Sequence, residues 1–197
     1  MEKLAQCPRL QTERLLLRAL QPEDEDDVCT LAGDRRIAET TYRIPHPYEP
    51  QHFREWLDLQ SQLLDKGTGV NWAVVRRNGR QFIGAVGLNI KPADERTELG
   101  YWIGAPYWNQ GYGTEAAAAV LRFAFDRLKL NRVEAHHMSR NPASGRIMKR
   151  IGMHHEGTLH QFIKKWGAFE DVEIYGLVRA QDRERVLRTS ECDHEGQ

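Results

Sequence analysis

Apolar and polar residues follow one another in blocks that predict strands in the first half of the chain. The run "TERLLLRAL" at residues 12–20 predicts a first strand, and Pro22 with the acidic residues 23–27 predicts a helix start. A second amphipathic stretch follows Pro50. The run "VNWAVVRRNGRQFIGAVGLNI" predicts two strands joined at Asn78-Gly79, a typical two-residue hairpin signal. With "RTELGYWIG" as a third strand, these runs predict an antiparallel meander.

The second half alternates helix and strand. Apolar residues recur at helical spacing from Ala117 to Leu128, and "RVEAHHMS" at 132–139 predicts a strand. Asn141-Pro142 supplies an N-cap and a proline at the first helical position, for a short helix that ends at Gly152. The run "HQFIKKWGAFEDVEIYGLV" predicts two strands around Trp166-Gly167. The fold class is therefore α+β, with a β-loop-α-β unit at the centre of an antiparallel sheet.

The length indicates a single domain, and the balance of charged residues indicates no strong electrostatic field around it. The chain has 197 residues, and Lys plus Arg equal Asp plus Glu at 28 each, so nothing favours nucleic acid or an acidic membrane surface. The three cysteines are scattered, no apolar run approaches the ~20 residues needed to span a bilayer, and the N-terminus does not resemble a signal peptide, which together predict a cytoplasmic location. We divide the chain into an N-terminal extension (1–9), one domain (10–180) and a polar tail (181–197).

Two glycines, Gly111 and Gly113, stand immediately before the central apolar helix. Glycine permits a tight turn and close approach to the main chain, and free N–H groups at a helix start suit a phosphate. The string from Gly111 to Ala116 also fits the dinucleotide fingerprint G-x-G-x-x-A, but an antiparallel meander precedes it and residues 106–109 intervene. A P-loop is excluded because no Lys-Ser or Lys-Thr follows. A tight strand-to-helix connection without a ligand remains an alternative.

Five blocks in order carry a resemblance that covers residues 10–178. They are "TERLLLRAL", "ELGYWIGAPYWNQGYGTEA", "LKLNRVEA", "NPASGRIMKRIGM" and "EDVEIYGLV". Together they resemble the GNAT superfamily of N-acetyltransferases, in the branch of the ribosomal-protein N-terminal (alanine/serine) acetyltransferases. The resemblance implies a mostly antiparallel mixed sheet that is splayed at its centre and flanked by helices. It also implies acetyl-CoA as cosubstrate, and no metal.

The resemblance implies which residues bind the cofactor. Backbone amides of the loop would cradle the pyrophosphate: Gln110, Gly111, Tyr112, Gly113 and Thr114. The strand would pair with the pantetheine arm through Tyr101, Trp102 and Ile103, and an amide near Trp102 or Ile103 would stabilise the oxyanion. Asn141 and Arg146 complete the set. The family usually has Gln or Arg three residues before its first glycine, where this chain has Trp108, as is common in this branch.

Two residues are candidates for the chemistry. An ammonium has no lone pair, so the reaction needs a base, and the resemblance implies Glu98, acting through water. The alternative is a solvated strand-edge residue paired with Arg96 or another cation. Ser144 would assist the leaving thiolate, because many relatives carry a Tyr where this chain has Met148. The alternative is that Ser144 only reinforces the helix cap at Asn141.

The acceptor stays open between two classes. A protein N-terminal α-amine needs an open groove, whereas a small amine (a polyamine, an amino acid or an antibiotic-like compound) needs a closed pocket, and the loops at 40–50 and 160–170 decide between them. A non-catalytic acyl-CoA-binding module and a homodimer are further possibilities. His136-His137 and His154-His155 are not metal sites, because strand neighbours point to opposite faces. Trp166, Phe169 and Tyr175 form either a pocket wall or core.

Overall fold

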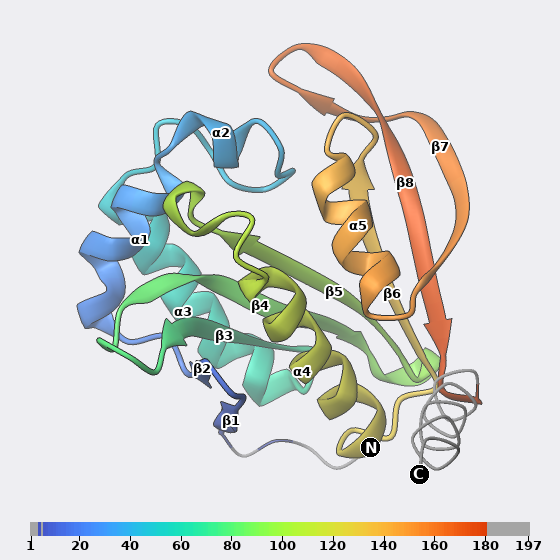
Figure 1. Ribbon diagram of the computed structural model, residues 1–197, viewed down its shortest axis with the longest axis horizontal. Coiled ribbons are helices and arrows are strands. Elements are labelled where there is room, and N and C mark those ends of the chain that lie inside the picture. The colour runs from blue at the N-terminus through green and yellow to red at the C-terminus, as the bar shows by residue number, and fades with distance from the viewer. Residues whose placement is uncertain (1–3, 5, 181–197) are drawn as a thin grey trace, which may run out of the picture.

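An eight-stranded sheet runs through the protein in the order β1-β2-β3-β4-β5-β6-β8-β7 (Figure 1). This computed structural model describes residue 4 and residues 6–180, so the expected polar tail at 181–197 lies outside the described residues. The strands are β1 (Leu10–Gln11), β2 (Leu15–Arg18), β3 (Gly69–Arg76), β4 (Phe82–Lys91), β5 (Arg96–Ile103), β6 (Arg132–Met138), β7 (His154–Lys165) and β8 (Ala168–Val178). The helices are α1 (Glu25–Ala32), α2 (Arg35–Ala38), α3 (Pro50–Lys66), α4 (Tyr112–Asp126) and α5 (Pro142–Arg150).

The centre of the sheet is splayed, as expected. Strands β3, β4 and β5 form the antiparallel meander, and α4 then crosses over to β6, which pairs parallel to β5. The parallel ladder holds from Arg96↔Arg132 only as far as Glu98↔Glu134, although both strands continue beyond it. A parallel pair needs such a crossover connection. We call the place where β5 and β6 separate the fork.

Helices cover both faces of the sheet (Figure 1). On one face, α4 packs Ala116, Val120 and Leu121 onto the main core, and α5 adds Met148. On the other face, α1 and α3 enclose a second core that includes Phe53. We call these the α4 face and the α3 face. Helices α4 and α5 pack on β5 and β6, whereas α1 and α3 pack on β4 and β3, so the fork is covered by helices on the α4 face.

The hairpins at Asn78-Gly79 and at Trp166-Gly167 differ in the length of their turns. The expected two-residue turn at Asn78-Gly79 is instead a loop of residues 77–80, closed by a bond from Arg76 N to Gln81 O of 2.9 Å. The Trp166-Gly167 pair forms the tight turn, with φ of 49° and 88°. Two consecutive positive φ values match the twist of the flanking strands.

The first expected strand is shorter than its sequence run. Thr12 N donates to Leu15 O at 3.0 Å, so the chain turns at residues 12–14, and within the run only Leu15–Arg18 forms a strand, β2, which pairs with β1 just before the run. Ahead of them, Cys7 and Pro8 of the N-terminal extension contact β3, where the indole of Trp72 donates to Pro8 O at 2.6 Å.

Candidate active site

Backbone amides of β5 face the fork. Gly104 N, just beyond β5, donates to the carbonyl oxygen of Ile83 on β4 at 2.8 Å. Because hydrogen-bonding direction alternates along a strand, the amides of Tyr101 and Ile103 point away from β4, toward the gap, and the amide of Trp102 points to β4. Of the two amides considered for an oxyanion, the geometry therefore favours Ile103. Its carbonyl is already engaged by the exposed Trp108, whose indole N–H donates to it at 2.6 Å.

The glycine loop delivers a helix N-terminus beside the fork. Gly111 is the N-cap of α4, with φ of 81°, a left-handed conformation that favours glycine. The first bond of the helix runs from Glu115 N to Gly111 O, at 3.0 Å. The amides of Tyr112, Gly113 and Thr114 precede this bond, so they are the free donors that an anion requires.

Gly113 has a different reason for being glycine. It lies within α4, and a Cβ built there would come within 2.9 Å of Ile147 Cδ1 on α5 and 3.6 Å of Ile103 Cγ1. The sequence interpretation attributed both glycines to close approach of a ligand. At Gly113 the structure shows instead that glycine allows α5 to pack tightly against α4.

A brace from the start of β2 holds the loop in place. Arg14 donates to Gln110 O at 2.9 Å and to the Glu115 carboxylate at 2.7 Å, and Thr12 donates to the same carboxylate at 2.6 Å. Burial raises the pKa of Glu115, but these hydrogen bonds outweigh it, so the pKa lies below its usual range. Sequence reasoning missed this brace because Arg14 and Glu115 are far apart along the chain.

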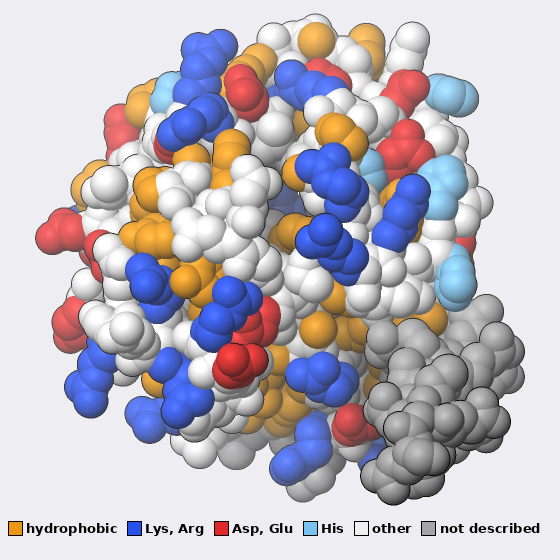
Figure 2. Space-filling view, in the orientation of Figure 1, with side chains coloured by type: hydrophobic (Ala, Val, Ile, Leu, Met, Phe, Trp, Pro, Cys, Tyr) orange, Lys and Arg blue, Asp and Glu red, His pale blue; other side chains and the backbone are white. Residues whose placement is uncertain are grey.

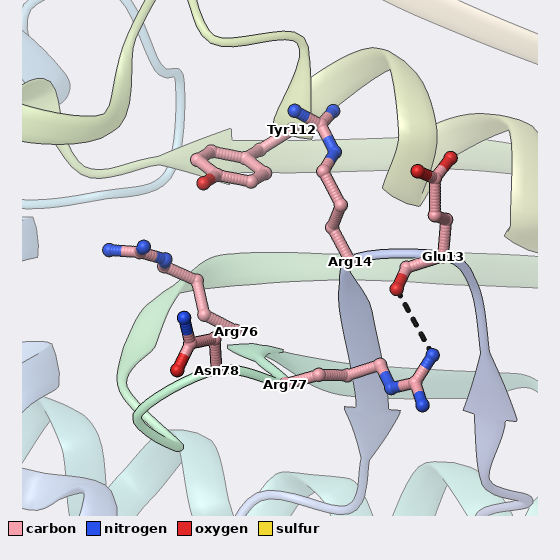
Figure 3. A pocket seen from close by; sticks show the side chains of 6 residues that line it. All are labelled: Glu13, Arg14, Arg76, Arg77, Asn78 and Tyr112. Atoms are coloured by element: carbon pink, nitrogen blue, oxygen red, sulfur yellow. Dashed lines mark hydrogen bonds between the residues drawn. The ribbon is translucent and has the colours of Figure 1, made fainter.

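The Tyr112 side chain points away from the loop into a basic pocket (Figure 3). The pocket has a volume of about 550 Å³ and is lined by Glu13, Arg14, Arg76, Arg77, Asn78 and Tyr112. The guanidinium of Arg14 lies 4.7 Å from the Tyr112 ring centre, and that of Arg76 lies 5.9 Å from it. Tyr112 can therefore offer its amide to a ligand while its ring anchors the loop.

A hollow lies between the loop that precedes α4 and helix α5, with Lys and Arg side chains on the α5 side (Figure 2). On α5, Arg146, Lys149 and Arg150 are exposed. Together with the free amides of the loop, they give this hollow the character of a phosphate site. The donor set fits the pyrophosphate and phosphate groups of CoA.

Ser144 sits at the start of α5 and contacts β5. The Asn141 side chain caps the helix by accepting from Ser144 N at 3.4 Å, as expected. The Ser144 hydroxyl lies 2.9 Å from the Tyr101 hydroxyl, which also reaches Ser144 O at 3.0 Å. Burial raises the pKa of Tyr101, so it stays a neutral donor. Met148 is buried in the core. Sequence reasoning missed the Tyr101 hydroxyl because it gave only the backbone of β5 a role.

His137 lies beside this pair on the α4 face of the fork. Its Nδ1 is 2.8 Å from Met138 O, so Nδ1 carries the proton and Nε2 offers a lone pair. Within the described residues, Nε2 is buried without a hydrogen-bond partner. It points at α5, because a Cβ on Gly145 would lie 2.6 Å from it. An orphaned buried polar atom is unusual and fits a site that a ligand completes.

Glu98 and His136 face each other on the α3 face of the fork. His136 Nδ1 lies 3.7 Å from Glu98 Oε1, and both side chains are about one-third exposed. Among the described residues no Lys or Arg pairs with Glu98, because Arg96 bonds Glu134 at 2.5 Å instead. Arg96 is therefore not the partner of Glu98, and the cation that could pair with it is His136. Glu134 is paired with Arg96 and Arg132, whereas the neighbour of Glu98 is His136.

The candidate groups lie on opposite sides of the sheet. Side chains alternate along a strand, so Glu98 shares the α3 face with Trp102, which packs 5.9 Å from Phe82. Tyr101 is on the other face, where it bonds Ser144 on α5. A molecule held in the fork would therefore meet a carboxylate on one side and a hydroxyl pair on the other.

Neither a candidate metal site nor a membrane-spanning helix is found in the described part of the chain. Over residue 4 and residues 6–180, no group of three or more His, Cys, Asp or Glu side chains is placed to hold a metal ion. No helix in the same range has the length and apolarity needed to cross a bilayer.

Comparisons with known proteins agree with this geometry. The family model for the Acetyltransferase (GNAT) domain matches residues 14–154. The chain is 25% identical over 176 residues to the uncharacterized N-acetyltransferase YoaA of Bacillus subtilis (strain 168), covering 89% of this chain and 99% of that protein.

Two solved structures share the fold. RimL, a ribosomal L7/L12 alpha-N-protein acetyltransferase in complex with coenzyme A, aligns with a TM-score of 0.81 at 18% identity, over 89% of this chain and 100% of that one. A chimera of the spermidine N-acetyltransferase SpeG from Vibrio cholerae and hSSAT aligns with a TM-score of 0.73 at 22% identity, over 85% and 97%. At these identities the likeness concerns the fold alone.

Proposed function

The chain belongs to the GNAT acetyltransferase family, and from this premise we propose that it transfers an acetyl group from acetyl-CoA to a primary amine by direct attack in a ternary complex. It is an acyltransferase enzyme, and acetyl-CoA is the family's cosubstrate. The observation that carries the mechanism is the fork, with an uncompensated carboxylate on one face and a hydroxyl pair on the other.

The cofactor would lie on the α4 face. The amides of residues 110–114 bind the pyrophosphate, and Arg146 on α5 reaches a phosphate. The free edge of β5 from Tyr101 to Ile103 pairs with the pantetheine arm as a neighbouring strand would. Asn141 fixes the start of α5 beside the fork. The His137 lone pair provides an acceptor for a donor of the bound cofactor.

Amine attack would come from the α3 face. Glu98, with His136 beside it, takes the proton that the ammonium must lose before its nitrogen can attack the thioester carbon. As the new C–N bond forms, the amide of Ile103 stabilises charge on the carbonyl oxygen. The C–S bond then breaks, and the sulfur leaves with its electron pair toward Ser144. The Ser144 hydroxyl, with Tyr101 as its partner, donates a hydrogen bond to the thiolate and keeps its own proton, and the remaining excess proton of the nitrogen passes to solvent.

The proposed acceptor is a primary amine, either on a protein or on a small molecule. A protein N-terminal α-amine and a small amine both satisfy the chemistry at Glu98. RimL is described as acting on a protein, and the SpeG chimera as a spermidine acetyltransferase, so the shared fold serves both kinds of acceptor.

Binding and turnover should be tested in that order. Calorimetry with CoA is expected to show binding, and Gly111→Val is expected to abolish it in a folded protein, because valine disfavours the φ of 81° and blocks the amides. Arg122→Gln, an exposed position on α4, serves as the control. A thiol-release assay with acetyl-CoA and a panel of amines then tests transfer. Undiminished CoA affinity in folded Gly111→Val would refute the phosphate cradle.

A further inference from the structure

The two loops that decide between a groove and a pocket are bonded to each other. Lys165, at the tip of the β7–β8 hairpin, donates to Ile44 O at 2.9 Å and to Tyr42 O at 3.4 Å. Arg140, just beyond β6, donates to Glu39 O at 2.6 Å. Residues 39–44 follow α2, so these bonds join segments from opposite sides of the fork. We call this connection the bridge.

Aromatic contacts reinforce the bridge. The guanidinium of Arg35 lies 5.0 Å from the centre of the Trp166 ring, and the Lys165 ammonium lies 5.2 Å from it. The His46 ring centre is 6.2 Å from that of Trp166. In Figure 1 the hairpin tip leans toward α2, and the segment after α2 extends toward α5. Trp166 thus packs against the loop, although half of its side chain remains exposed.

The bridge lies at the open end of the fork. Continuing the parallel register from Glu98↔Glu134 puts residues 101–103 of β5 level with residues 137–139 of β6, and Arg140 comes next. The Arg140 guanidinium also contacts Met138 Sδ at 3.6 Å. A segment held across this end obstructs a groove that would run out of the fork there. Such an obstruction suits a small acceptor.

The charge under the bridge is unbalanced. Lys165 is only 7% exposed, yet among the described residues no Asp or Glu oxygen lies within ion-pair distance of its ammonium. Burial, and then the neighbouring Arg140, lower the pKa of Lys165. Arg140 is paired with Glu170 at 3.3 Å, while Lys165 has only carbonyls and a ring. A buried cation without a counter-ion is costly, so an anionic ligand would complete this site.

We propose that the acceptor is a small amine that carries a carboxylate, as an amino acid does, and that this carboxylate binds beneath the bridge between Lys165 and Arg140. The amine then lies near the level of Ile103, where the thioester is attacked, and its proton reaches Glu98 through water. A spermidine-like polycation is repelled by the same charges, and a longer polypeptide cannot pass the bridge. This inference rests on the proposed acetyl transfer and names its substrate class.

Matched acceptors test the carboxylate. Amino acids are compared with their own carboxamides, with spermidine, and with longer peptides that share the same N-terminal residue, all by thiol release. The carboxylates are expected to exceed the carboxamides in kcat/KM by about 10- to 100-fold, because each carboxamide forgoes a charge-assisted bond. In Lys165→Met this preference should fall to near unity. Lys164→Met, its exposed neighbour, should keep the preference.

A second readout does not depend on turnover. Trypsin can cut after Arg43, inside the bridged loop. Lys165→Met should be cut there faster than the wild type, and an accepted amino acid should protect the wild type alone. Equal use of carboxylates and carboxamides, or preference for spermidine or long peptides, would overturn this inference and leave acetyl transfer standing. No turnover with any of the four classes would instead overturn the proposed function.

Discussion

Replacing Glu98 by Gln should separate the general base from the neighbouring charged groups. Glu98 and Glu134 are partners in the register of β5 and β6, so they are two carboxylates at the same level of the fork. Glu134 is held by Arg96 at 2.5 Å and by Arg132 at 3.5 Å, whereas the one ionisable partner of Glu98 within residues 6–180 is His136, at 3.7 Å. The same substitution at the two positions should therefore have opposite consequences.

The expected size follows from these contacts. A general base contributes roughly 10²- to 10⁴-fold, and Glu98, acting through water, should lie near the lower end, so Glu98→Gln should reduce kcat by ~10²-fold, about 2.7 kcal/mol in the barrier. Stability should change little, because no arginine loses a partner. Glu134→Gln should instead cost about 1–3 kcal/mol of stability through its arginine bonds and leave kcat nearly intact.

Steady-state kinetics across a range of pH and thermal unfolding measure the two effects independently. The kinetic defect of Glu98→Gln should shrink as pH rises, because the free amine becomes abundant without a base. Acetyl-CoA affinity should stay unchanged, which calorimetry verifies. Wild-type rates for Glu98→Gln at every pH, with the same stability, would refute the reasoning and assign the proton to a water chain.

Three further perturbations probe the rest of the site and the fold. Tyr101→Phe removes the partner of the Ser144 hydroxyl and should lower both the melting temperature and kcat. Ser144→Ala should reduce turnover by ~10- to 10³-fold. If Ser144→Ala keeps full turnover but loses stability, the role of Ser144 is structural. Gly113→Ala should change the free energy of unfolding by less than about 1 kcal/mol in denaturant unfolding, because its Cβ meets only the flexible end of Ile147 and alanine favours the helix; a larger loss of stability would contradict this. Hydrogen bonds from Ser139, Thr158 and His155 lower the pKa of Glu173 to about 2. The contribution of Glu173 to stability should therefore be fully present above about pH 4.5 and be lost as pH falls toward 2. In acid unfolding, Glu173→Gln should make stability less dependent on pH over this range.

Several parts of the fold follow from local pattern. Asn141 and Pro142 begin α5 because an N-cap acceptor and a proline at the first position satisfy a helix start locally. Trp166-Gly167 ends one strand and begins the next because glycine accepts a positive φ there. At Asn78-Gly79 the same local reasoning chose the wrong turn length, since a closing bond between Arg76 and Gln81 decides it.

The candidate site was predictable wherever backbone amides or a single residue type carry the chemistry. A glycine before an apolar helix is compatible with a phosphate site, and Gly111 has the positive φ that a tight turn requires. Glu98 was predictable as a carboxylate on the central strand. From the sequence, Arg96 was a possible partner of Glu98. In the structure Arg96 pairs with Glu134, and only the tertiary structure could show this.

The sequence by itself determined the elements, the glycine loop and the family resemblance, because these depend on short spacings along the chain. Only the tertiary structure decided which groups meet. His136 reaches Glu98, Tyr101 reaches Ser144, and Lys165 crosses to the loop after α2, each over many residues of intervening chain. Such contacts depend on strand order and on the separation of β5 from β6, and no local periodicity encodes either.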